Sequence, residues 1–221
     1  MRPRRTLQRL HVWLAWVAGV PLLFWTVSGL WMVARPIDEV RGAGLRAPPP
    51  MLAPPALLRP PGGPLRTLAL ERQGERIVWI AVRPDGESFR ADPSSGRRLG
   101  PVTMPEARTL AAAALAKPAA IESITRSTAD RPPLDLRRPR PALGVTFTGG
   151  DRIYLDAETG QVLALRTQQW RAFDWMWGLH IMDLSGRENS SHAILIGFAA
   201  LALLATIVGL ILLPLSARRR K

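Results

Sequence analysis

The chain has 221 residues, 47% of them hydrophobic, and a formal charge of +13. It contains no cysteine, which excludes disulfides, thiol catalysis and zinc–thiolate or iron–sulfur sites. The two tails contribute +8 of this net charge, and the rest of the chain contributes +5. The basic tail residues are Arg2, Arg4, Arg5, Arg9, Arg218, Arg219, Arg220 and Lys221. This placement, without a zinc-ligand spacing or an RNA-binding aromatic motif, argues against nucleic acid as a partner.

The first apolar block spans residues 10–34 and follows a basic tail at 1–9. It has no formally charged side chain and is long enough to cross a bilayer. Trp13 and Trp31 lie near its two ends, as in an aromatic belt. Residues 32–34 are a poor match to a signal-peptide cleavage site, so we interpret the block as an uncleaved transmembrane helix.

The second apolar block spans residues 193–215, with possible helix-capping side chains at 189–191 and a basic tail at 216–221. Because short basic tails remain in the cytoplasm, both termini are expected to be cytoplasmic. Two crossings then place the central region outside. The sequence thus predicts a two-pass protein of the bacterial inner (cytoplasmic) membrane with a periplasmic central domain.

Residues 35–64 are rich in proline, glycine and alanine. Successive prolines forbid a helix interior or a central strand, so we interpret this segment as a semi-rigid spacer. A proline-rich ligand for a partner domain is the alternative.

Residues 65–168 show alternating runs that end in turn residues, which is typical of short strands and hairpins. The alanine-rich run beginning with Pro105 and Glu106 is typical of a helix, because both residues suit a first turn. The expected strands are 67–70, 77–82, 88–91, 121–126, 143–148, 153–155 and 161–165, and the expected helix is 105–117.

A turn motif occurs twice in this domain. Asp92 and Asp156 lie 64 positions apart, as do Gly96 and Gly160. An aspartate starts such a turn by accepting backbone N–H bonds, and the glycine supplies a positive φ. The predicted fold class is therefore an α+β extracytoplasmic domain, a small antiparallel sheet with a helix, internally duplicated and flanked by two transmembrane α-helices.

Residues 169–192 form a tryptophan-rich amphipathic segment. Trp170, Phe173, Trp177 and Ile181 follow helical spacing on one side. Two interpretations remain open: an interfacial helix lying at the level of the lipid headgroups, or a helix that covers the core of the sheet.

Three tracts carry a family resemblance. Residues 152–163 (RIYLDAETGQVL) resemble the core hairpin of PepSY domains, and residues 10–30 resemble the first helix of PepSY-associated transmembrane proteins. Residues 173–189 (FDWMWGLHIMDLSGREN) are also similar to that group. The resemblance implies a helix with a small antiparallel sheet, an extracytoplasmic location and an inhibitory or regulatory role linked to peptidases. Larger PepSY membrane proteins resemble haem-carrying reductases, but this chain has only two apolar blocks.

The chain has three histidines, His11, His180 and His192, which are the candidate haem ligands. His11 and His192 are expected at opposite membrane faces, so one haem would need His180 with His192, or symmetry-related copies in a dimer. The alternative is that all three are packing or interfacial side chains. Adjacent Ser190, Ser191 and His192 lack the glycines of a nucleophile elbow, so a hydrolytic site is not expected.

From these observations we expect a membrane-tethered periplasmic binding or regulatory module of PepSY type, without catalysis of its own. The alternative function is a haem-binding electron-transfer subunit that acts as a dimer or with a partner. The expected partners are the lipid bilayer and either a second copy or another membrane or periplasmic protein.

Overall fold

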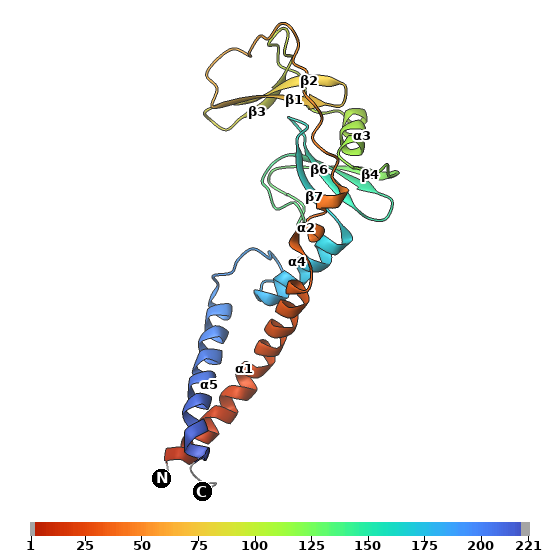
Figure 1. Cartoon of the computed structure of the whole chain (residues 1–221). Coiled ribbons are helices and arrows are strands. Elements are labelled where there is room, and N and C mark those ends of the chain that lie inside the picture. Colours follow the sequence, from red (N-terminus) through yellow and green to blue (C-terminus); the bar gives the residue numbers. More distant parts are fainter. Residues whose placement is uncertain (1–2, 218–221) are drawn as a thin grey trace. The chain divides into compact units, whose positions relative to one another are not determined.

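The computed structural model describes residues 3–217, and the chain divides into two compact units (Figure 1). One unit comprises residues 1–36 and 172–221, and the other comprises residues 37–171. Arg2 and residues 218–221, on which part of the topology prediction rests, lie outside the described residues.

Helices α1 (Pro3–Val33) and α5 (Ala193–Ala217) form the membrane unit. Within them, residues 5–33 and 193–214 are long and apolar enough to cross a membrane, with mean hydropathies of 1.7 and 2.8. This matches the two predicted apolar helices, although α1 begins well before residue 10. The extra turns carry Arg4, Arg5 and Arg9 of the predicted tail.

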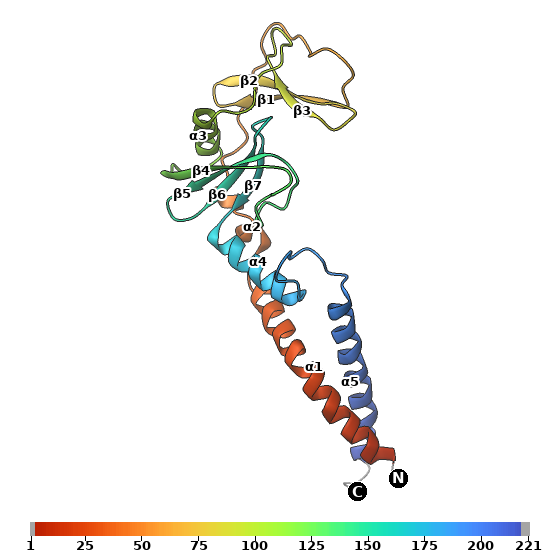
Figure 2. The ribbon, with the colours of Figure 1, turned by 180° about the vertical axis from the view of Figure 1, so that it is seen from behind.

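The two helices pack through a narrow apolar seam and lie side by side in both views (Figures 1 and 2). Leu14, Val208 and Leu212 are buried in this seam. Most other apolar side chains of both helices are exposed, including Trp13 and Trp16 at 72% and 74%. A helix that is apolar on all sides but packed on only one is suited to lipid.

The segment before α5 is built around two aspartates. Helix α4 (Gln168–His180) belongs to the membrane unit from residue 172 onward. Asp174 of α4 is buried and pairs with Arg187 of the following loop at 2.8 Å. Asp183 accepts backbone N–H bonds from Gly186, Glu188 and Asn189, and these bonds lower the pKa of its carboxyl group despite partial burial. The loop is therefore held by local hydrogen bonds.

The cap of α5 differs from the sequence prediction. The prediction places it at residues 189–191, but the Leu195 N–H donates to His192 Nδ1 at 3.3 Å. His192 directly precedes the first helical residue, Ala193, so its ring satisfies one of the free N–H groups of the first turn.

The second unit contains two antiparallel sheets rather than the one sheet predicted. The first has the order β1-β2-β3 and the second the order β4-β5-β6-β7. The predicted strands are confirmed within a few residues: β1 (Thr67–Gln73), β2 (Arg76–Val82), β3 (Ser88–Ala91), β4 (Ile121–Ser127), β5 (Ala142–Phe147), β6 (Arg152–Asp156) and β7 (Val162–Arg166). The predicted internal duplication stays a prediction, since three strands precede the helix and four follow it.

The main core lies between helix α3 (Met104–Ala113) and the second sheet (Figure 2). Ala107 and Ala111 of α3 are fully buried against Val145 and Ile153. Small alanines allow the helix to approach the sheet closely. In the chain, α3 lies between the strands of the first sheet and those of the second, and it packs on the second.

The proline-rich segment lies along the second unit. After the short elements α2 (Ile37–Val40) and η1 (Ala43–Leu45), the Ala47 N–H donates to Ala114 O at 2.9 Å. Further along, the Trp79 indole N–H donates to Arg59 O at 3.0 Å. Gly96 lies so close to the segment that an added Cβ would come within 2.7 Å of Pro60 O. The segment predicted as a spacer is therefore bound to the unit at several points.

Candidate functional site

Two turns carry the residues that sequence analysis selected in the α+β unit. Asp156 Oδ1 accepts the N–H groups of Glu158 and Thr159 at 2.9 and 2.8 Å, and Gly160 has φ +75°. The Asp156 side chain is buried and its other oxygen pairs with Arg140 at 3.2 Å. These contacts give Asp156 a role in shaping the hairpin between β6 and β7.

The corresponding turn after β3 is more exposed to solvent. Asp92 Oδ1 accepts hydrogen bonds from the hydroxyl and backbone N–H groups of Ser94 and Ser95, and Gly96 has φ +71°. Because these bonds favour the charged carboxylate, they lower the pKa of Asp92 to about 2. Both turns combine an aspartate that accepts backbone N–H bonds with a glycine at positive φ, but only Asp156 is buried.

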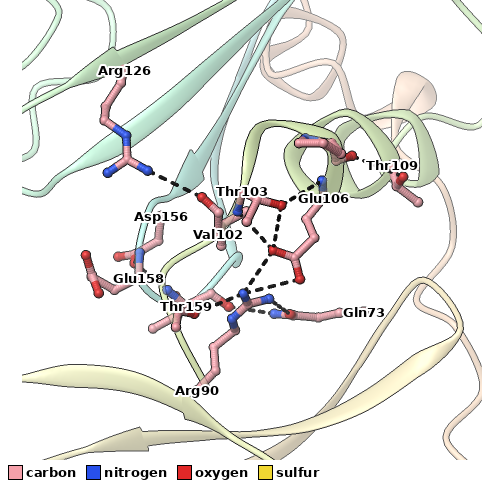
Figure 3. Close-up of polar contacts among 12 residues, drawn as sticks. Gln73, Arg90, Val102, Thr103, Glu106, Thr109, Arg126, Asp156, Glu158 and Thr159 are labelled. Atoms are coloured by element: carbon pink, nitrogen blue, oxygen red, sulfur yellow. Dashed lines mark hydrogen bonds and ion pairs between the residues drawn. The ribbon is translucent and has the colours of Figure 1, made fainter. Parts of the chain in front are cut away.

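A polar junction links the two sheets around Arg90, whose side chain is almost fully buried (Figure 3). Arg90 donates to the Glu106 carboxylate at 3.3 Å, to Gly100 O at 3.1 Å and to Gln73 Oε1 at 3.3 Å. Gln73 in turn donates to Thr159 O at 2.6 Å. The network therefore joins β3, α3, β1 and the turn between β6 and β7.

Glu106 also closes the capping box of α3 with Thr103. Burial raises the pKa of this carboxyl group. Hydrogen bonds from Thr103 and the positive charge of Arg90 outweigh that effect, so the pKa lies below its ordinary value. The carboxylate is thus held in its charged form by the contacts that fix the helix.

Beside this junction lies a groove of about 310 Å³, which falls at the lower end of the size range of ligand pockets. The ends of β1 and α3, the start of β7 and three consecutive prolines form its walls. The lining residues include Arg46, Pro48–Pro50, Arg72, Leu110, Val162 and Leu165. Strand, helix and proline-rich segment thus meet at one concave surface.

His180 packs against α1 and also lines an open hollow together with residues of that helix. Its Nε2 accepts the Trp25 indole N–H at 2.9 Å, so the proton of the neutral ring lies on Nδ1. That N–H lies 3.1 Å from both Ser28 Oγ and Trp25 O. Gly29 gives room for the ring, because a Cβ there would lie 3.3 Å from the imidazole.

His192 and His11 have different contacts. His192 accepts at Nδ1, so its Nε2 carries the proton and donates to Ile181 O at 2.8 Å. His11 Nδ1 lies 3.2 Å from Ala205 O of α5, and Gly209 provides space for its ring. Both nitrogens of His180 and of His192 are therefore used.

These contacts do not fit a haem held by His180 and His192 of one chain. Iron ligation by either ring would break a hydrogen bond that its nitrogen makes in this structure. Within residues 3–217 no group of three or more histidine, aspartate or glutamate side chains is placed to hold a metal ion.

A comparison with protein-family models matches residues 8–221 to the PepSY-associated TM region. The chain belongs to this family. The match includes both apolar helices and the whole α+β unit, so it identifies a membrane protein of PepSY type rather than a soluble domain with apolar ends. Neither the comparison with curated proteins nor that with solved structures finds a match.

Of the residues of the junction and the groove, the sequence pointed to Gly160 as a turn residue and to Glu106 as a first-turn residue, but not to the others. The T-x-x-E spacing of Thr103 and Glu106 is a recognisable capping box, so the bond between these two side chains could also have been predicted. Arg90 carries no such pattern, because it is a buried arginine in a four-residue strand. Its partners lie 10 to 17 residues away and are joined to it only by the fold.

Proposed function

We propose that this chain is a two-pass protein of the bacterial inner membrane whose α+β unit lies in the periplasm and acts as a binding and regulatory module. The observation that carries the proposal is the extent of the family match, which includes the helices and the module together. A module held at both ends by membrane helices acts only on partners at the membrane surface.

The contacts of the polar side chains support a binding role. Asp156, Glu106 and Arg90 are each held by several hydrogen bonds that shape a turn, a helix start or the junction between sheets. Such contacts maintain a rigid surface, which lowers the entropy cost of binding a partner. The resemblance to PepSY domains points to peptidases as the class of regulated partner.

The topology is tested first with reporter fusions. We expect a reporter after Lys221 to be cytoplasmic and a reporter within residues 48–64 to be periplasmic, because the basic tails stay inside. A periplasmic reporter at Lys221 would contradict the two-crossing arrangement.

The regulatory role is tested by proteolysis in the periplasm. An unstructured, exported reporter substrate is followed in cells that express the wild-type chain or a Gly160→Val variant. The valine would strain a residue at φ +75° that lies close to Leu110, so it should disrupt the module and leave the membrane helices in place. We expect faster loss of the substrate in the variant. Equal rates at equal membrane levels would refute regulation of proteolysis.

A further inference from the structure

The groove beside the junction has two walls with unpaired strand edges. Strand β7 is last in the order β4-β5-β6-β7, and β1 is first in the order β1-β2-β3. Alternate N–H and C=O groups along the outer side of an edge strand lack a partner strand. An extended peptide binds such an edge through main-chain hydrogen bonds.

The chain's own proline-rich segment does not pair with this edge. Pro48, Pro49 and Pro50 also line the groove. Proline has no backbone N–H and cannot donate to a strand. The preceding Ala47 N–H donates to Ala114 O, and among the described residues no backbone hydrogen bond joins residues 46–50 to β7. The hydrogen-bonding edge of β7 is therefore not occupied by this segment.

The rim of the groove is positively charged. Arg46 is exposed, and no ion pair or hydrogen bond to its guanidinium occurs among the described residues. Arg72 is held at the rim because its Nε donates to Gly74 O and its Nη1 to Met51 O. The acid of the rim, Glu71, accepts a hydrogen bond from Gln161. Two guanidinium groups against one carboxylate favour an anionic ligand.

The floor of the groove is apolar. Leu110 of α3 and Leu165 of β7 lie there, and Val162 at the start of β7 is 42% exposed. An aliphatic side chain placed on this floor would be removed from water. The combination of a strand edge, an apolar floor and a cationic rim defines the chemistry of the ligand.

We propose that this groove binds the C-terminal end of an extended apolar peptide, with the chain's β7 edge pairing the peptide backbone and Arg46 pairing its terminal carboxylate. The inference rests on the proposed binding role of the module and names its ligand. A fatty acid would satisfy the rim and the floor, but it has no amides to pair with β7, so the strand edge favours the peptide.

The test uses the full chain in lipid nanodiscs, which avoids detergent in the groove. The probe is a short valine–leucine peptide with an N-terminal fluorophore, prepared as the free acid and as the C-terminal amide, and binding is followed by anisotropy. We expect amidation to weaken binding about tenfold, because it removes a charge-assisted contact. Methylation of alternate peptide nitrogens should weaken it as well, because it blocks strand pairing.

Two variants locate the site. Arg46→Glu should weaken binding of the free acid to the level of the amide. Arg108→Glu is the matched control, since Arg108 is exposed on α3, does not line the groove and receives the same change of charge. The proposal is overturned by equal affinity for acid and amide, by equal effects of the two variants, or by a fatty acid that competes as well as the peptide.

The outcome separates the two proposals. Loss of peptide binding in Arg46→Glu with unchanged control of periplasmic proteolysis would leave the regulatory role and remove its link to this groove. Peptide binding without any effect of the module on proteolysis would leave the groove as a peptide site and remove the regulatory role.

Discussion

Gly160 offers the sharpest test of how the α+β unit is held together. It closes the turn between β6 and β7 with φ +75°, and an added Cβ would lie 3.0 Å from Leu110 Cδ1 and 3.1 Å from both polar atoms of the Gln73 amide. Gly74 provides the matched control. Its φ is +62°, but the nearest atom to an added Cβ, a methyl of Thr109, is 3.8 Å away.

The two replacements by alanine differ in one respect. Both place a side chain in the left-handed region, at a cost of about 1 kcal/mol. Gly160→Ala must in addition displace Leu110 or the Gln73 amide that bonds Thr159 O, which costs about 1–2 kcal/mol more. We therefore expect about 2–3 kcal/mol of destabilisation for Gly160→Ala and about 1 kcal/mol for Gly74→Ala.

Thermal unfolding of the full chain in a mild detergent, followed by circular dichroism, measures the difference. At about 4 °C per kcal/mol, Gly160→Ala should lower the Tm of the α+β unit by about 10 °C and Gly74→Ala by about 4 °C. Equal decreases would show that Leu110 and Gln73 do not crowd Gly160. No decrease in either variant would refute the positive φ as well.

Three further predictions concern other parts of the chain. Because folding lowers the pKa of Glu106, the contribution of this carboxylate to stability is present above its ordinary pKa of 4.5 and is lost as pH falls through the lower folded pKa. Glu106→Gln should therefore flatten the Tm-against-pH curve in this acidic range. An unchanged slope would contradict this. Gly209→Leu should reduce crosslinking between α1 and α5, because a Cβ at this position would lie 3.0 Å from His11 Cε1. Gly19→Leu is the control and should preserve the crosslink, because nothing lies within 4 Å of its added Cβ. Asp174→Ala should destabilise the loop before α5 by about 3 kcal/mol, because Arg187 loses its buried partner. Hydrogen exchange of the loop measures this loss of stability. The double variant with Arg187→Met should recover part of the lost protection.

Local sequence patterns predicted the strands and the longer helices of this protein, but not the short elements α2 and η1. The apolar blocks predicted α1 and α5 because a helix that crosses lipid needs about 20 apolar residues in one run. Alternation and turn chemistry predicted the strands, since an aspartate and a glycine such as Asp156 and Gly160 act within five residues of each other. The family resemblance rested on the same local tracts and is confirmed.

Contacts between distant residues decided the rest. The segment containing Pro48–Pro50 was predicted as a spacer because prolines exclude helix and strand, but its position depends on hydrogen bonds to α3 and the first sheet. His180 was a candidate ligand by residue type alone, and only its approach to Trp25, 155 residues earlier, shows how its nitrogens are used. Arg90 and Gln73 had no sequence pattern, because the network that joins the two sheets forms only when both sheets are folded. Sequence patterns report local backbone preference and burial, whereas the groove and the junction depend on which segments meet in space.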